Sequence, residues 1–323
     1  MKIEKNKISV VIPCYNSENT VNIVVKNLIE LFKSHTNYSY EIILINDGSK
    51  DNTWGKINSL SEEYENIRGI NFSKNFGQHN ALMAGYRHVT GEIIVGLDDD
   101  GEHNPTELFK IVDKLLEGYD YVCADYETKQ SFLRKMGTKL NNLMATYMIG
   151  KPKDINFSSY YAMKRFVVDE IIRYQQPFPY VGGLVLRSTT NFATVRLERQ
   201  KRLEGKSGYS IKKMASLWFN GFTAFSIKPL RLATFLGFIA SSVGFVWILI
   251  LLIRKIFGNS VMSGYTSIMA CLIFFCGIIM MMLGIIGEYL GRVYISLNKA
   301  PKYVIKDKTN TDKSFPEGNH INE

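Results

Sequence analysis

Cysteine is scarce in this chain of 323 residues, with only Cys14, Cys123, Cys271 and Cys276. Their spacing is not that of a metal site, and we expect small, reduced, apolar side chains. Despite a net charge of +9, no basic run with interleaved aromatic residues resembles a groove for single-stranded nucleic acid or a reading helix, which argues against nucleic acid as a partner. Only a short apolar run follows residues 1–7, so no signal peptide is expected.

Charge is absent from two stretches near the C-terminus, 232–253 and 265–286, each 22 residues long. At about 1.5 Å per residue, each would form a helix of about 33 Å, enough to cross a hydrocarbon core of about 30 Å. Two long core helices of a soluble protein are the alternative, but such helices usually keep a polar stripe. The sequence therefore predicts a hairpin of two transmembrane helices over 229–290.

Basic residues predict the orientation of this hairpin, because Lys and Arg gather on the cytoplasmic side of membranes. They precede the first span and follow the second, so both termini are expected in the cytoplasm and the chain in the cytoplasmic (inner) membrane. Residues 211–228 mix lysines with aromatic residues at helical spacing, which predicts amphipathic helices at the interface or, alternatively, helices packed on the cytosolic core. Small residues in the spans permit a homo-oligomer. The cytoplasmic tail, 291–323, is typical of disorder from about residue 306.

Short apolar runs alternate with helical patterns from the N-terminus to about residue 125. Runs that are apolar on both faces and separated by helices predict a Rossmann-like α/β domain with a mostly parallel sheet. In such sheets, ligands bind beyond the carboxyl ends of the strands. We expect residues 1–125 to bind the main ligand and residues 126–210 to form the other half of the same domain.

Polar clusters follow three of the predicted strands, at residues 13–16, 46–49 and 98–103. Asn-Asp-Gly-Ser at 46–49 is also ordinary turn and capping chemistry when it stands alone. The consecutive carboxylates Asp98, Asp99 and Asp100 repel one another unless a positive charge lies among them. A divalent cation completed by nucleotide phosphates supplies that charge, and a solvated loop at a helix N-terminus is the alternative.

These motifs together resemble a known family. VVIPCYN at 10–16, NDGSKD at 46–51, NFGQ at 75–78 and DDD at 98–100 are similar to the family-2, A-fold glycosyltransferases. The paired apolar stretches and GEYLGRVY at 287–294 narrow the resemblance to the polyprenyl-phosphate glycosyltransferases, in particular the bacterial undecaprenyl-phosphate branch, which is similar to dolichol-phosphate mannose synthase.

The resemblance implies a role for individual residues. Nucleotide contacts fall on Pro13, Tyr15, Asp47, Lys74, Asp98 and Asp99. Asp100 and Glu102 would hold Mg²⁺ or Mn²⁺, with Glu102 at a position where the family often has Gln. Asp98, Asp100 and Arg202 form the implied catalytic set, and Arg202 lies in a loop that resembles the family's Arg-X-X-Gly-X-Ser-X-Tyr segment. Arg134 and Lys135 are expected to hold the acceptor phosphate.

The implied reaction is the transfer of a sugar, with inversion, from a nucleotide-sugar donor, a UDP-sugar, to undecaprenyl phosphate. No general base is assigned, because Ser159 stands where the family has an acidic residue, and Asp154 is only near in sequence. A processive polysaccharide synthase is an alternative, disfavoured by the single hairpin and by the absence of a Gln-X-X-Arg-Trp motif. A non-catalytic, nucleotide-binding membrane scaffold is another.

Overall fold

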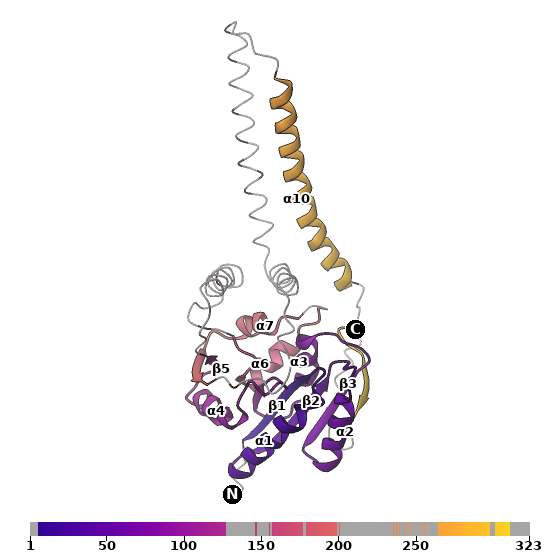
Figure 1. Ribbon diagram of the computed structural model, residues 1–323. Coiled ribbons are helices and arrows are strands. Elements are labelled where there is room, and N and C mark those ends of the chain that lie inside the picture. The colour runs from indigo at the N-terminus through magenta and orange to yellow at the C-terminus, as the bar shows by residue number, and fades with distance from the viewer. Residues whose placement is uncertain are drawn as a thin grey trace. The chain divides into compact units, whose positions relative to one another are not determined.

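The computed structural model describes residues 6–126, 157–176, 179–198, 264–297 and 301–310, together with isolated residues between these ranges. The chain forms two compact units (Figure 1). One unit comprises Met1–Tyr209 and Pro301–Glu323, and the other comprises Ser210–Ala300. The first unit therefore contains both the beginning and the end of the chain. The candidate site also lies in this unit.

An eight-stranded sheet forms the first unit, in the order β7-β5-β6-β4-β1-β2-β3-β8. Its strands are β1 (Lys7–Cys14), β2 (Ser39–Asn46), β3 (Ile67–Phe72), β4 (Ile93–Gly96), β5 (Tyr121–Tyr126), β6 (Tyr161–Lys164), β7 (Phe192–Leu197) and β8 (Ile305–Lys308). The pairs β4–β1, β1–β2, β2–β3 and β5–β7 are parallel. The predicted α/β fold with a mostly parallel sheet is therefore confirmed.

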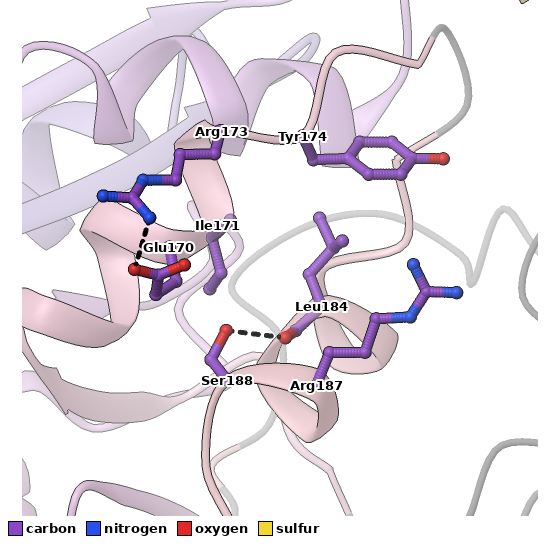
Figure 2. A pocket seen from close by; sticks show the side chains of 7 residues that line it. All are labelled: Glu170, Ile171, Arg173, Tyr174, Leu184, Arg187 and Ser188. Atoms are coloured by element: carbon purple, nitrogen blue, oxygen red, sulfur yellow. Dashed lines mark hydrogen bonds and ion pairs between the residues drawn. The ribbon is translucent and has the colours of Figure 1, made fainter.

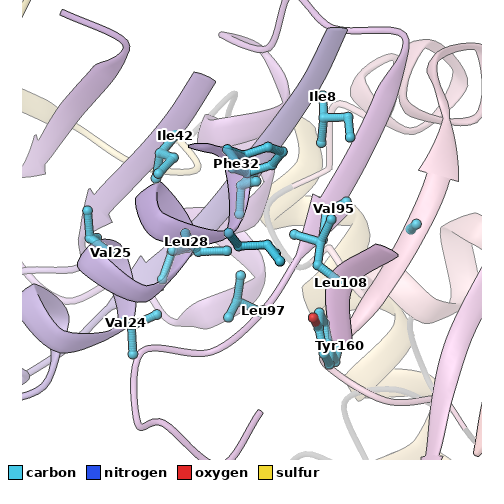
Figure 3. Packing of buried hydrophobic residues seen from close by; sticks show 14 of the residues in the cluster. Ile8, Val24, Val25, Leu28, Phe32, Ile42, Val95, Leu97, Leu108 and Tyr160 are labelled. Carbon is cyan, nitrogen blue, oxygen red and sulfur yellow. The ribbon is translucent and has the colours of Figure 1, made fainter. Parts of the chain in front are cut away.

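Helices cover both faces of this sheet (Figure 1). They are α1 (Val21–Ser34), α2 (Thr53–Glu63), α3 (Gln78–Tyr86), α4 (Leu108–Leu116), α6 (Arg165–Ile172) and α7 (Val181–Ser188), with a short 3₁₀ turn, η1 (Pro105–Glu107), before α4. On one face, Leu28 and Phe32 of α1 pack among Ile8, Ile42 and Leu108 (Figure 3). This apolar layer holds α1 against the sheet.

Two strands run against the parallel direction, and neither was predicted. β6 lies between β4 and β5 and is antiparallel to both. β8 pairs antiparallel with β3 at the other side of the sheet. The prediction of disorder from residue 306 is wrong for residues 306–310, because a polar segment becomes a strand when it meets an open sheet edge that supplies hydrogen bonds.

In the second unit, the structure describes α10 (Tyr265–Leu297), which begins at the first residue of the second predicted span. Its side chains include exposed apolar residues, among them Ile268, Met280 and Leu290. Among the residues that the structure describes, no helix combines the length and the apolar character needed to cross a membrane. The interfacial segment 211–228 lies outside the described residues, as does most of the first predicted span.

Candidate active site at the carboxyl ends of the central strands

The ends of β1, β2 and β4 are joined by hydrogen bonds just beyond the sheet. The amide of Tyr15, after β1, donates to Oδ2 of Asp99, after β4, at 3.0 Å. The amide of Asn16 donates to Oγ of Ser49, after β2, also at 3.0 Å. Because β4, β1 and β2 are parallel neighbours, the polar clusters predicted at their ends meet at one rim. We call the ends of β1, β2 and β4 the site rim.

Tyr15 and Pro13, the two predicted nucleotide contacts of β1, have different surroundings. Pro13 is buried within β1, opposite Ile45 of β2. Tyr15 is 48% exposed directly after the strand, a position from which an aromatic ring can stack on a base. The structure thus makes Tyr15 available at the rim and gives Pro13 a place in the sheet.

Asp47, directly after β2, is buried and binds the loop that follows β3. Its Oδ1 accepts from the amide of Phe76 at 2.7 Å, and its Oδ2 accepts from the amide of Gly77 at 2.9 Å. Burial raises the pKa of Asp47 to about 6, although the two amide hydrogen bonds act in the opposite direction. The predicted contact with a base remains a prediction, and the structure adds a loop-holding role that the sequence did not signal.

Lys74 lies on this same loop, next to the turn at Gly48. Gly48 has a φ of +64°, and a Cβ atom there would lie 2.3 Å from the backbone carbon of Lys74 and 2.4 Å from the nitrogen of Asn75. Only glycine allows so close an approach of two backbones. The Lys74 side chain is exposed, with Nζ 5.2 Å from the centre of the Phe76 ring. The loop is therefore fixed while the lysine extends from it.

Asp98 follows β4 and is held on both sides by side chains. Its Oδ1 accepts from Nε2 of Gln78, the first residue of α3, at 2.7 Å. Its Oδ2 accepts from Oγ of Ser159, just before β6, at 2.5 Å. The carboxylate remains partly exposed, so it is both oriented and accessible.

Asp99 and Asp100 complete the acidic cluster. Desolvation raises the pKa of Asp99 to about 7; the hydrogen bond from Tyr15 opposes the shift, and the charges of Asp98 and Asp100 add to it. Oδ1 of Asp100 accepts from the amide of Glu102 at 3.0 Å. These groups resist carrying several negative charges together, and a nearby cation would relieve that repulsion.

The oxygen donors of this cluster fit a hard divalent cation. Mg²⁺ is commonly held by one or two carboxylates, with its other ligands supplied by water and substrate phosphates. In the described part of the chain, no three His, Cys, Asp or Glu side chains are grouped as a complete metal site. Asp100 and Glu102 are joined through the hydrogen bond above, so the pair predicted as metal ligands lies in one turn.

Several residues of this site were not predicted. His103 is buried, with its ring nitrogens contacting the Tyr126 hydroxyl at 2.6 Å and Oγ of Ser159 at 2.9 Å. Gln78 falls within a motif noted in the sequence, and His103 lies in the acidic run, but neither had a signal for its partner. The predicted Arg134, Lys135 and Arg202 lie outside the described residues.

A cavity of about 400 Å³ lies elsewhere in this unit, between α6 and α7 (Figure 2). Arg173 pairs with Glu170 at 2.9 Å on its α6 side, and Ser188 donates to the Leu184 carbonyl on its α7 side. The cavity contains none of the predicted site residues. The site rim is therefore defined by its polar contacts rather than by this hollow.

Comparison with known proteins identifies the class. Residues 9–172 match the model of glycosyl transferase family 2, and residues 228–293 match that of the GtrB C-terminal hairpin. An uncharacterized glycosyltransferase of Bacillus subtilis is 33% identical over 92% of this chain and 93% of its own. The chain belongs to glycosyl transferase family 2 and is a glycosyltransferase, which confirms the predicted resemblance.

Two further relatives carry more informative names. A prophage bactoprenol glucosyl transferase homolog of Escherichia coli is 35% identical, over 93% of this chain and 98% of its own. An undecaprenyl-phosphate 4-deoxy-4-formamido-L-arabinose transferase of Photorhabdus laumondii is 31% identical, over 95% and 96%. The similarity thus extends over nearly the whole of each chain.

Proposed function

We propose that the protein transfers a sugar, with inversion, from a UDP-sugar to undecaprenyl phosphate at the cytoplasmic face of the membrane. The observation that carries the proposal is the meeting of three strand-end clusters at one rim, with an exposed aromatic ring and an oriented carboxylate. Relatives named for bactoprenol and undecaprenyl phosphate support the acceptor. The match to the family hairpin supports a membrane attachment.

In this mechanism the donor lies along the site rim. Tyr15 stacks on the base, Lys74 approaches the diphosphate, and Asp98 accepts a hydrogen bond from a hydroxyl of the nucleotide or sugar. Asp100 and Glu102 would hold Mg²⁺ or Mn²⁺, which when bound offsets the negative charge that grows on the departing diphosphate. Beyond the described residues, Arg202 is assigned to the diphosphate, and Arg134 and Lys135 to the acceptor phosphate.

The chemical step is a single displacement. An oxygen of the lipid phosphate forms a bond to the anomeric carbon, on the face opposite the donor diphosphate. The bond from that carbon to the donor phosphate oxygen breaks, and its electron pair leaves with UDP. Since a phosphate monoester has a second pKa near 6, the acceptor is already ionised at neutral pH and needs orientation more than deprotonation.

Transfer by the purified full-length chain tests this proposal. The assay supplies a panel of UDP-sugars and GDP-sugars, Mg²⁺ or Mn²⁺, and undecaprenyl phosphate in detergent, and detects the glycolipid by mass spectrometry. Asp100→Ala is expected to lower turnover by about a hundredfold or more. Asp113→Ala, at an exposed position of α4, is the matched control and should keep wild-type turnover. Full activity of D100A, or a polymeric product, would contradict the proposal.

The membrane arrangement is tested separately. We propose two spans within 229–290, supported by the two uncharged stretches and by exposed apolar side chains on α10, such as Met280 at 70%. Alkaline phosphatase inserted in the loop at 254–264 should be active, because this loop is expected on the non-cytoplasmic side of the membrane. The same enzyme fused to the C-terminus should be inactive, and the reverse pattern would overturn the orientation.

A further inference from the structure

A chain of hydrogen bonds runs from the partly buried Tyr126 to the carboxylate of Asp98. The Tyr126 hydroxyl lies 2.6 Å from Nδ1 of His103, and Nε2 of His103 lies 2.9 Å from Oγ of Ser159. Oγ of Ser159 donates to Oδ2 of Asp98 at 2.5 Å, whereas Nε2 of His103 is 3.5 Å from that oxygen. His103 therefore reaches Asp98 through the serine rather than directly.

The proton positions follow from hydrogen-bonding capacity. A serine hydroxyl has one hydrogen, and here it is donated to the carboxylate, so Oγ must accept from Nε2–H of His103. In the neutral ring, Nδ1 then accepts from the Tyr126 hydroxyl. The neutral tautomer with its hydrogen on Nε2 satisfies all three contacts.

Packing holds this chain in place. The His103 ring is 3% exposed and lies between Tyr126, with ring centres 5.6 Å apart, and Tyr160, at 5.3 Å. The Tyr160 hydroxyl donates to the carbonyl of Asn104 at 3.2 Å, which fastens the segment of Ser159 to the loop of His103. The His103 ring therefore cannot turn away from Ser159 without disrupting its contacts with Tyr126 and Tyr160.

The two oxygens of Asp98 are thus held differently. Gln78, which holds Oδ1, is exposed, whereas the Ser159–His103 side leads into the protein interior. Repulsion from Asp99 and Asp100 favours rotation of the Asp98 carboxylate away from the cluster. The hydroxyl of Ser159, which the buried His103 holds in place, opposes that rotation even when the exposed glutamine moves.

We propose that Ser159 and His103 are positioning residues for sugar transfer, which hold the Asp98 carboxylate in the orientation that the donor requires. The inference rests on the proposed function and extends it to two residues that do not touch the donor. Small errors in the orientation of a contacting group reduce turnover steeply, while binding that other contacts supply is less affected.

The test compares Ser159→Ala with Ser159→Thr, which keeps the hydroxyl. Turnover is expressed per UDP-binding site, measured by calorimetric titration, so that any unfolded protein is removed from the comparison. S159A should lower kcat by about tenfold to a hundredfold and change the affinity for UDP by less than about threefold. S159T should recover most of the loss. Ser188→Ala, which removes a hydroxyl from α7, is the control and should match the wild type.

The linkage itself is tested by adding His103→Gln. If His103 acts through Ser159, the double variant S159A/H103Q should be no slower than S159A alone. Additive losses, wild-type kcat in S159A, or equal losses in S159A and S159T would each overturn the positioning role. These outcomes require an active wild-type enzyme, so failure of the proposed function is recognised separately, by the absence of any glycolipid product.

Discussion

Two regions of the sheet carry dense hydrogen bonding between polar groups, and they use it differently. At the site rim, Asp98 is held by side chains and stays partly exposed. At the β3–β8 edge, polar groups close the sheet: Asn71 donates to Asp307 at 2.9 Å, and Thr309 and Gly69 exchange hydrogen bonds. The same residue types therefore leave a carboxylate accessible in one place and bind residues 305–310 to the sheet in the other.

Asp47 is the exception that makes this comparison informative. It lies at the rim in sequence and in space, yet both its oxygens accept backbone amides, as at the edge. A strand-end carboxylate is thus not sufficient evidence of a ligand contact. Asp98 differs from Asp47, because its oxygens are held by the side chains of Gln78 and Ser159 and it stays partly exposed.

The largest expected effect is on catalysis at the rim. Asp98→Asn replaces one acceptor oxygen by an NH₂ group, which would face a donor from Gln78 or Ser159. We expect turnover to fall by about a hundredfold or more, with a melting temperature within a few degrees of wild type. Steady-state kinetics and thermal unfolding measure the two. If D98N lost stability as well as activity, Asp98 would act as a structural residue, as the polar groups of the β3–β8 edge do.

Gly48→Ala should affect stability although it lies at the rim. The added Cβ would collide with the backbone of Lys74, and residue 48 would keep a left-handed backbone conformation that alanine disfavours. We expect a loss of about 3 kcal/mol in unfolding free energy. Gly118→Ala is the matched control, because φ is +118° there but nothing lies within 4 Å of the added atom. Denaturant unfolding of both variants separates the collision from the strain. Similar losses in the two would mean that the close approach contributes nothing.

At the edge, Asn310→Ala should destabilise without slowing catalysis. Nδ2 of Asn310 donates to the carbonyls of Ser61 and Ile67, each at 2.7 Å, and fastens the chain after β8. Loss of these bonds is expected to cost about 2 kcal/mol. Asn58→Ala removes an exposed amide from α2 and should cost less than about 0.5 kcal/mol. A drop in turnover per folded N310A molecule would show that the edge also shapes the site.

The central α/β pattern and the clusters at the strand ends were predictable from the sequence, because both depend on local signals. Apolar runs at 8–12, 41–46 and 92–97 predict buried parallel strands, and the polar residues directly after them must lie at the carboxyl edge of the sheet. The sequence therefore placed the polar residues after β1, β2 and β4 at one edge of the sheet, although the hydrogen bonds that each oxygen of Asp47 accepts were not predictable.

Contacts between distant segments were not predictable. Ser159 meets Asp98 only because β6 enters the sheet antiparallel beside β4, and the sequence between β5 and β6 carries no sign of that reversal. β8 reads Ile-Lys-Asp-Lys, a polar run that becomes a strand through its pairing with β3. Both depend on which edge a segment meets, a property of the folded sheet rather than of local sequence.

The smallest predicted effect is the pH dependence of the β3–β8 edge. Nδ1 of His88 contacts the Ala84 carbonyl at 2.7 Å, and Nε2 lies 3.1 Å from Nζ of Lys308. Burial, with Lys308, Arg68 and Arg87 nearby, lowers the pKa of His88 to about 4 from 6.5. Below pH 6.5, His88 is protonated in the unfolded chain but stays neutral in the folded chain. The free energy of unfolding therefore falls as the pH decreases toward 4.

By pH 5.5 this group alone should lower the free energy of unfolding by about 1 kcal/mol. His88→Gln should reduce the loss between pH 7 and pH 5.5, measured by urea unfolding at each pH. The loss should not vanish, because burial also lowers the pKa of His79 to about 4. If H88Q kept the wild-type loss of stability between pH 7 and pH 5.5, the β3–β8 edge would be stabilised by hydrogen bonds and packing alone, with no contribution from a neutral histidine beside Lys308.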